Sequence, residues 1–291
     1  MKQIAILIFV FLTQTGDDPA VPTLPEEQSA RFLDFYKKEA AKYQMYADDH
    51  GQLKFNPDPV FRFASPIDNN FNGTLFVWTR DGKAEVIGSI WAMPEKTSNG
   101  KRRIVHEFQT LATEPVEGKI SGTLAWFPKK TGIDLQPVPD APKPAATAAL
   151  RLIQIRALAR EFSATEDVGG GKVDAMRMLP QPIYRYESES KEHAESKHVP
   201  DGAVFVFLNE FDPEVFLIIE ERSTPDGMRW HYAFARFCRL PVTGRHKDVE
   251  VWTCEVNNTM TDPQSTHYCN FAATYTDWEL PAPDISDEQK R

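Results

Sequence analysis

The chain contains 291 residues, and its 33 lysines and arginines against 42 aspartates and glutamates give a formal net charge of −9. Hydrophobic residues make up 41% and charged residues 26%, which is typical of a globular protein and excludes a wholly disordered, collagen-like or multi-span membrane chain. The acidic balance disfavours nucleic acid as a partner, because phosphate groups would be repelled. Three cysteines are too few for a disulfide-rich scaffold.

The N-terminus has the order of segments typical of a secretory signal peptide. Lys2 is followed by nine apolar residues at 4–12 and a small polar stretch at 13–16. The apolar run is shorter than the roughly 20 residues that a membrane-spanning helix needs. We therefore predict a signal peptide over 1–16, a proline-containing tether over 17–25 and an extracytoplasmic protein, periplasmic or secreted. A buried N-terminal strand is the alternative, and cleavage or retention of the signal as an anchor is left open.

The next segments form two helix-and-strand series. In the first, residues 26–46 have helical spacing of apolar side chains, and strands are expected over 74–79, 84–93 and 102–113, followed by one carrying Trp126. An Asp-Gly turn at 81–82 predicts a hairpin between the first two strands. In the second, a helix is expected over 146–163, then strands over 203–209, 215–222 and 229–240, and one carrying Trp252.

The two series match each other in sequence, which predicts an internal duplication. Residues 73–91 align with 202–220 without gaps, with six of 19 positions identical. Residues 103–126 align with 229–252, with six of 24 identical. Consecutive strands joined by tight turns predict antiparallel meanders, so the expected fold is α+β: two tandem homologous repeats, each an N-terminal helix packed on an antiparallel β-meander.

The same patterns divide the chain. Repeat 1 is expected over 26–133 and repeat 2 over 148–255, with a proline-rich connector at 134–147 that forms no strand pairs and a polar C-terminal tail at 256–291. The strands at 74–79 and 203–209 are apolar on both faces, which indicates that both faces are covered. We therefore expect the two halves to pack into one body.

The cysteines and one acidic pair are given structural roles. Cys254 and Cys269 lie 15 residues apart and could form a disulfide worth about 3 kcal/mol. Cys238 lies in an apolar strand, which favours a buried free thiol. Glu220 ends an apolar strand beside Glu221, so one inward carboxylate is expected to pair with Arg229, Arg236 or Arg185 in a structural ion pair.

Few residues suggest a functional site. His106 and Glu107 are adjacent in an expected strand, so their side chains should face opposite sides of the sheet. His106, His231, Glu220 and Trp91 are retained as candidate ligand-binding residues. No motif predicts a catalytic residue or a cofactor site, and no H-x-H, H-E-x-x-H or C-x-x-C spacing predicts a zinc site.

The chain resembles an uncharacterised family of exported proteins from planctomycete bacteria. The resemblance covers residues 26–255 and depends on the apolar start and on segments that include LFVWTRDGKAEVIGSIW, HEFQTLA, RLIQIRALAREFSA, LPQPIYRY, DGAVFVFLNEFDPEVFLIIEER and RWHYAFAR. It implies an extracytoplasmic bacterial protein and brings no activity, ligand or catalytic residue.

These observations favour a non-catalytic binding or interaction protein of the bacterial envelope, whose partner is an unknown ligand or envelope protein. The alternative is an extracytoplasmic hydrolase or small-molecule-binding enzyme with a site between the two repeats, using His106 or His231. A third interpretation is a structural envelope protein that self-associates.

Overall fold

The computed structural model describes residues 26–47, 51–65, 71–94, 101–186 and 200–276, and it corrects the predicted fold class. Two helices and nineteen strands are found in this part of the chain, so the protein is mostly β rather than α+β. All the sheets are antiparallel, but neither half is a simple meander, because each half divides its strands between two sheets. The predicted signal peptide and tether lie outside the described residues.

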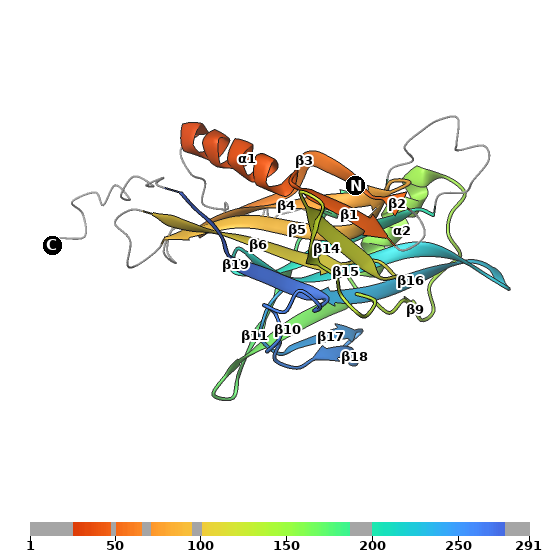
Figure 1. Ribbon diagram of the computed structural model, residues 1–291. Coiled ribbons are helices and arrows are strands. Elements are labelled where there is room, and N and C mark those ends of the chain that lie inside the picture. Colours follow the sequence, from red (N-terminus) through yellow and green to blue (C-terminus); the bar gives the residue numbers. More distant parts are fainter. Residues whose placement is uncertain (1–25, 48–50, 66–70, 95–100, 187–199, 277–291) are drawn as a thin grey trace, which may run out of the picture.

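The first half builds one small and one large sheet. Its small sheet has the order β2-β1-β7-β8 and its large sheet β19-β6-β5-β4-β3. Helix α1 lies across β4 and β5 of the large sheet (Figure 1). The elements of this half are α1 (Glu26–Ala40), β1 (Tyr43–Ala47), β2 (Gly51–Gln52), β3 (Lys54–Ser65), β4 (Phe71–Arg80), β5 (Lys83–Pro94), β6 (Arg102–Thr110), β7 (Val116–Ile120) and β8 (Thr123–Trp126).

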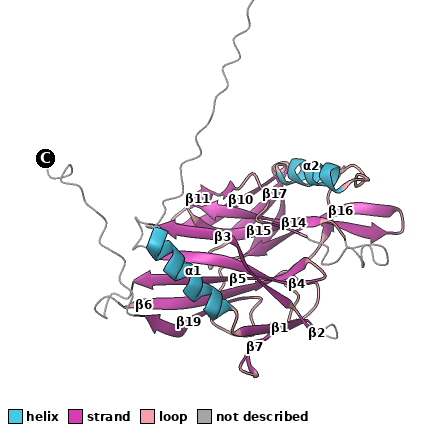
Figure 2. Cartoon of the chain, turned by 90° about the horizontal axis from the view of Figure 1, so that it is seen from above, coloured by secondary structure: helices cyan, strands magenta, loops and turns pink. Residues whose placement is uncertain are grey.

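The second half has sheets of corresponding order. Its small sheet is β11-β10-β17-β18, and its large sheet is β12-β14-β15-β16-β9, with β13 also paired to β14. Helix α2 packs on β14 and β15, at a distance from α1 in the view from above (Figure 2). The elements are α2 (Ala148–Ala159), β10 (Phe162–Gly169), β11 (Lys172–Ala175), β12 (Arg177–Met178), β13 (Tyr184–Arg185), β14 (Gly202–Asn209), β15 (Asp212–Thr224), β16 (Gly227–Arg236), β17 (Val242–His246) and β18 (Val249–Cys254).

The two large sheets exchange their edge strands. Strand β9 (Gln136–Pro137), from the segment after the first half, pairs with β16 of the second. Strand β19 (His267–Thr276), from the segment after the second half, pairs with β6 of the first. The connector therefore does form strand pairs, and the expected polar tail contains a ten-residue strand. Both segments cover an otherwise open sheet edge, a pairing that local composition does not reveal.

Both predicted helices extend too far, because each is followed at once by a strand. Helix α1 ends at Ala40, and β1 then alternates buried Tyr43, Met45 and Ala47 with more exposed neighbours. Helix α2 ends at Ala159, and β10 begins at Phe162. The aromatic side chains that continued the helical spacing belong instead to strands with a period of two.

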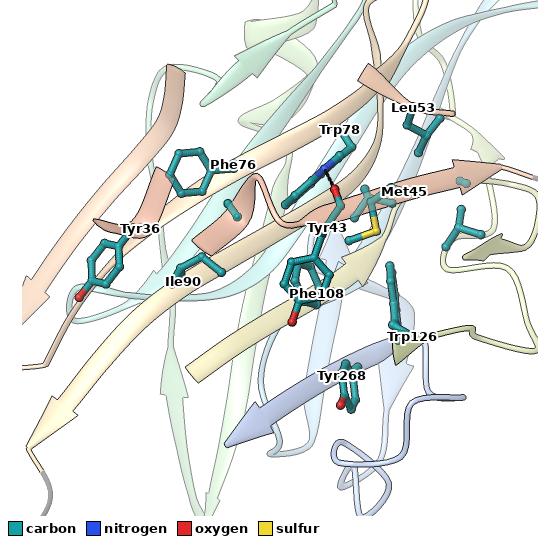
Figure 3. Close-up of a cluster of buried hydrophobic side chains, with 14 of the residues drawn as sticks. Tyr36, Tyr43, Met45, Leu53, Phe76, Trp78, Ile90, Phe108, Trp126 and Tyr268 are labelled. Carbon is teal, nitrogen blue, oxygen red and sulfur yellow. Dashed lines mark hydrogen bonds between the residues drawn. The ribbon is translucent and has the colours of Figure 1, made fainter. Parts of the chain in front are cut away.

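Three apolar clusters stabilise the fold. One lies beneath α1 and the small sheet of the first half and contains Trp78, Phe108 and Trp126; there the Trp78 indole donates a hydrogen bond to the Tyr43 carbonyl at 3.2 Å (Figure 3). A second cluster fills the corresponding place in the other half. The third joins side chains of both large sheets, including Val77 of β4 and Val206 of β14. Each large sheet is therefore covered on both faces, and the halves share a core.

Among the described residues, no helix is long and apolar enough to cross a membrane.

Candidate metal centre

A cavity of about 400 Å³ lies between the large sheet of the first half and the second half of the chain. Its walls combine aromatic and methionine side chains with carboxylates and thiols. The first half and β19 contribute Phe71, Trp91, Met93, Glu107, Cys269 and Phe271. The second half and the loop before β19 contribute Glu166, Asp212, Glu214, Phe237, Cys238, Arg239, Leu240 and Met260.

Glu107, His267 and Cys269 form the first group of metal-ligating side chains, here called the β6–β19 set. Cys269 is directly opposite Glu107 in the strand pair, and His267 lies two residues away on the same face. The Glu107 Oε1 atom lies 2.7 Å from His267 Nε2 and accepts from the Cys269 thiol at 3.2 Å. Trp91 Nε1 donates to the other carboxylate oxygen at 3.0 Å. Four side chains are therefore held together by the register of β5, β6 and β19.

Asn257 determines how His267 is oriented. The Asn257 Oδ1 atom accepts from the Thr259 backbone N–H and from its hydroxyl, both at 3.1 Å. The Asn257 amide nitrogen therefore faces His267 Nδ1 at 3.2 Å and donates to it. This assigns the proton of the neutral ring to Nε2, which then donates to Glu107. His267 is fully buried.

Glu166, Glu214 and Cys238 form the second group, here called the β10–β15 set. Their ligand atoms all lie within 4.8 Å of one another, as do those of the β6–β19 set. Asn209 donates to Glu166 at 2.8 Å. Cys238 lies just after β16, in a loop held by Arg236, whose guanidinium donates to the carbonyls of Cys238, Arg239, Leu240 and Glu255.

The cavity is strongly acidic. Burial raises the pKa of Asp212 and Glu214, and the neighbouring carboxylates raise both further. Both side chains keep partial exposure because they face the cavity. In the described ranges, no lysine or arginine forms an ion pair with Glu107, Glu166, Asp212 or Glu214. Arg239 lines the cavity but is exposed and donates to Asn258 at 3.4 Å.

The thiols are not activated as nucleophiles in this state. Burial and then Glu107 raise the pKa of Cys269 far above its usual value, and burial and then Glu214 do the same for Cys238. A nucleophilic cysteine needs the opposite shift. A bound cation would favour both thiolates, so the chemistry of the cavity is better suited to metal coordination than to covalent catalysis.

The first half of the chain contains a glutamate at the position that corresponds to Glu214, and there a cation pairs with the carboxylate. The β4–β5 and β14–β15 hairpins carry the same β-bulge, and the extra residue is Glu85 in one and Glu214 in the other. Arg80 binds Glu85 at 2.8 Å, and Lys83 lies 3.3 Å from Glu220.

The β14–β15 hairpin has an amide and a carboxylate at the two positions that correspond to these cations. Asn209 takes the place of Arg80, and Asp212 takes the place of Lys83. Glu214 therefore has neither of the two cations that lie near Glu85, and it has the carboxylate of Asp212 as a neighbour instead.

The predicted site residues do not converge. His106 faces α1, and its Nδ1 atom forms a hydrogen bond of 2.8 Å with the Tyr43 hydroxyl. Burial, and then the nearby charge of Lys42, lower the pKa of His106 to about 4. His231 lies beside β9 and contacts the Arg229 carbonyl. Of the candidate ligand-binding residues, only Trp91 lines the cavity.

Glu220 and the predicted disulfide differ from expectation. Glu220 is buried, but its partners are Lys83, Arg222 and the Tyr186 hydroxyl rather than the expected arginines. The three cysteines are free thiols, with Cys254 in β18 and Cys269 in β19, which belong to different sheets. The structure therefore does not form the Cys254–Cys269 pair.

Most residues of the cavity were not predicted as a site. Their positions are spread from residue 71 to residue 271, so no short spacing identifies them. One signal was available: aligning the halves places Asp212 opposite Lys83, a reversal of charge at one end of an apolar hairpin.

Comparisons of the chain with models of known families, with curated proteins and with solved structures found no match.

Proposed function

We propose that this protein binds a divalent transition-metal ion in the cavity between its halves, as a non-catalytic metal-binding protein. One observation carries the proposal: two sets of metal-ligating side chains present carboxylates and thiols to one cavity, where no described lysine or arginine pairs with the carboxylates. Buried carboxylates without a cation are costly, and an ion would neutralise them.

The ligand atoms favour a particular class of metal. Thiolates and imidazole select zinc and its neighbours in the first transition series, whereas calcium and magnesium prefer oxygen atoms alone. Cys238 and Cys269 would be left unused by a hard cation. Zinc is therefore the appropriate probe. Mixed sulfur, nitrogen and carboxylate ligands are common in zinc sites.

We also propose that the protein acts outside the cytoplasm. The apolar run at 4–12 and the resemblance to exported bacterial proteins support this location. Mass determination of the protein recovered from the envelope and cytoplasmic fractions of its native cells tests it. A chain cleaved near Thr15 supports export with cleavage, whereas a full-length chain recovered from the cytoplasm contradicts the location.

The binding proposal is tested by titrating the metal-free full chain with zinc against a competing chelator. Glu214→Gln removes one ligand charge and is expected to weaken zinc binding at least tenfold. Glu85→Gln is the matched control, because it changes the bulge carboxylate that already has Arg80 as a partner. This control should bind zinc as the unaltered protein does.

Two outcomes would count against the proposal. Absence of zinc binding by the folded, reduced protein would overturn it. Equal weakening in Glu214→Gln and Glu85→Gln would also overturn it, because the effect would then come from general destabilisation. Circular dichroism of each variant establishes that the fold is retained.

The size of the cavity supports a second candidate function. A volume of about 400 Å³ exceeds the need of one ion and falls within the range of small-molecule sites. Trp91, Phe237 and Phe271 supply an apolar wall. We therefore also consider a metal-dependent hydrolase acting on a small apolar substrate. Zinc-dependent cleavage of p-nitrophenyl esters that Glu214→Gln abolishes would favour this function, and no turnover by the zinc-loaded protein would reject it.

A further inference from the structure

We infer that the cavity takes two divalent transition-metal ions, one at each set. This inference rests on the proposed metal-binding function and goes beyond it, because a single ion would satisfy that function. It is carried by two separate clusters of metal-ligating side chains at one cavity.

Each set forms a separate cluster of ligand atoms. The β6–β19 set comes from one sheet edge and brings a carboxylate, a thiol and an imidazole within 4.8 Å of one another. The β10–β15 set brings two carboxylates and a thiol within the same limit. The described residues form these two clusters rather than one combined group, although both line the same cavity. Three protein ligands at one point are the usual number for a zinc ion with an open position.

Asp212 lines the same cavity but belongs to neither cluster of ligand atoms. It adds a third carboxylate from the second half to the wall of the cavity.

Among the described residues, neither set has a protein cation in the place that an ion would take. In the described ranges, no lysine or arginine forms an ion pair with Glu107, Glu166 or Glu214.

An acidic approach leads to Asp212 and Glu214. A second pocket of about 280 Å³ shares Phe71, Asp212 and Glu214 with the cavity and is also lined by Asp174 and Glu210. Glu210 is exposed at the β14–β15 turn. A cation entering from this turn meets negative charge along its path, which raises its local concentration.

The test is the zinc stoichiometry of the folded full chain, measured by native mass spectrometry. The unaltered protein is expected to retain two zinc ions. Cys269→Ser and Cys238→Ser should each retain one, and the double variant should retain none. Cys254→Ser is the matched control, because that thiol lies outside the cavity, and it should retain two.

A spectroscopic measurement covers the case in which a cysteine variant fails to fold. Cobalt(II) added to the unaltered protein should give thiolate charge-transfer absorption that grows until two equivalents are bound. Absorption that stops growing at one equivalent would overturn the two-ion inference.

The outcomes separate this inference from the proposed function. One ion in the unaltered protein, lost in both single cysteine variants, would overturn the two-ion inference and leave the metal-binding function standing. Two ions that both persist in Cys269→Ser would overturn the assignment of one ion to each set. No bound ion at all would overturn the inference and the proposed function together.

Discussion

At the scale of single residues, the cavity shows how one substitution changes the chemistry of a position. Glu85 and Glu214 both stand at a β-bulge, where the extra residue turns its side chain away from the regular pleat. Glu85 has Arg80 as an ion-pair partner, whereas Glu214 has Asp212 and Glu166 as electrostatic neighbours. The identity of the neighbouring side chain therefore decides whether the bulge carboxylate has a cationic partner within the protein.

Replacement of Asn257 tests the positioning of His267. Asn257→Leu removes the donor to Nδ1, so the ring can place its proton on either nitrogen and no longer orients Glu107. We expect zinc affinity to fall about 10- to 100-fold while the number of ions bound stays the same. Competition titrations measure the affinity. Asn258→Leu, at the exposed neighbouring residue, is the control, and an equal loss there would contradict the assigned role of Asn257.

At the scale of elements, sequence patterns located most strands and paired three of them correctly in each half, but the strands that carry Trp126 and Trp252 lie in the small sheets instead. The Asp-Gly turn predicted the hairpin correctly, and Asp81 and Gly82 have the positive φ angles of 51° and 82° that this turn requires. The strands β1 and β10 were missed because aromatic residues there continue the spacing of the preceding helix. The edge strands β9 and β19 were missed because their partners lie far away in sequence.

The side chains around Gly88 of β5 leave no space for an added methyl group. A Cβ atom at Gly88 would lie 2.6 Å from Phe108 Cδ1 and 3.0 Å from the Trp78 ring. We expect Gly88→Ala to lower the free energy of unfolding by about 1–3 kcal/mol, as measured by urea denaturation. Ser89→Ala, one residue on, removes a buried hydroxyl that has no hydrogen-bond partner and should be neutral or stabilising. An unchanged midpoint for Gly88→Ala would contradict this packing.

At the scale of the whole molecule, the expectation that the halves pack into one body agrees with the shared core between the large sheets. The apolar residues on both faces of β4 and β14 carried that expectation, because burial on two faces is visible in sequence. The cavity was not predictable in the same way. Its ligands come from β6, β10, β15, β19 and the loop after β16, and only the exchange of edge strands brings Cys269 beside Glu107.

The ion pair of Lys83 with Glu220 tests the contact between the halves. The pair joins β5 to β15, and the Glu220 carboxylate also accepts from Arg222 and Tyr186. Lys83→Met should destabilise the protein by about 2 kcal/mol, because a buried carboxylate loses a cation. A double-mutant cycle with Glu220→Gln should recover part of this loss, since the carboxylate is then neutral. Purely additive effects would show that the pair contributes no coupling.

The central claim is that the cavity coordinates a transition metal through thiolates from both halves. The most direct measurement is anomalous diffraction at the zinc absorption edge from crystals of the zinc-loaded full chain. The predicted result is strong anomalous density inside the cavity at about 2.3 Å from the Cys238 sulfur atom, and likewise at about 2.3 Å from the Cys269 sulfur atom. Zinc that appears only at surface residues, with both thiols of the cavity left uncoordinated, would contradict the account.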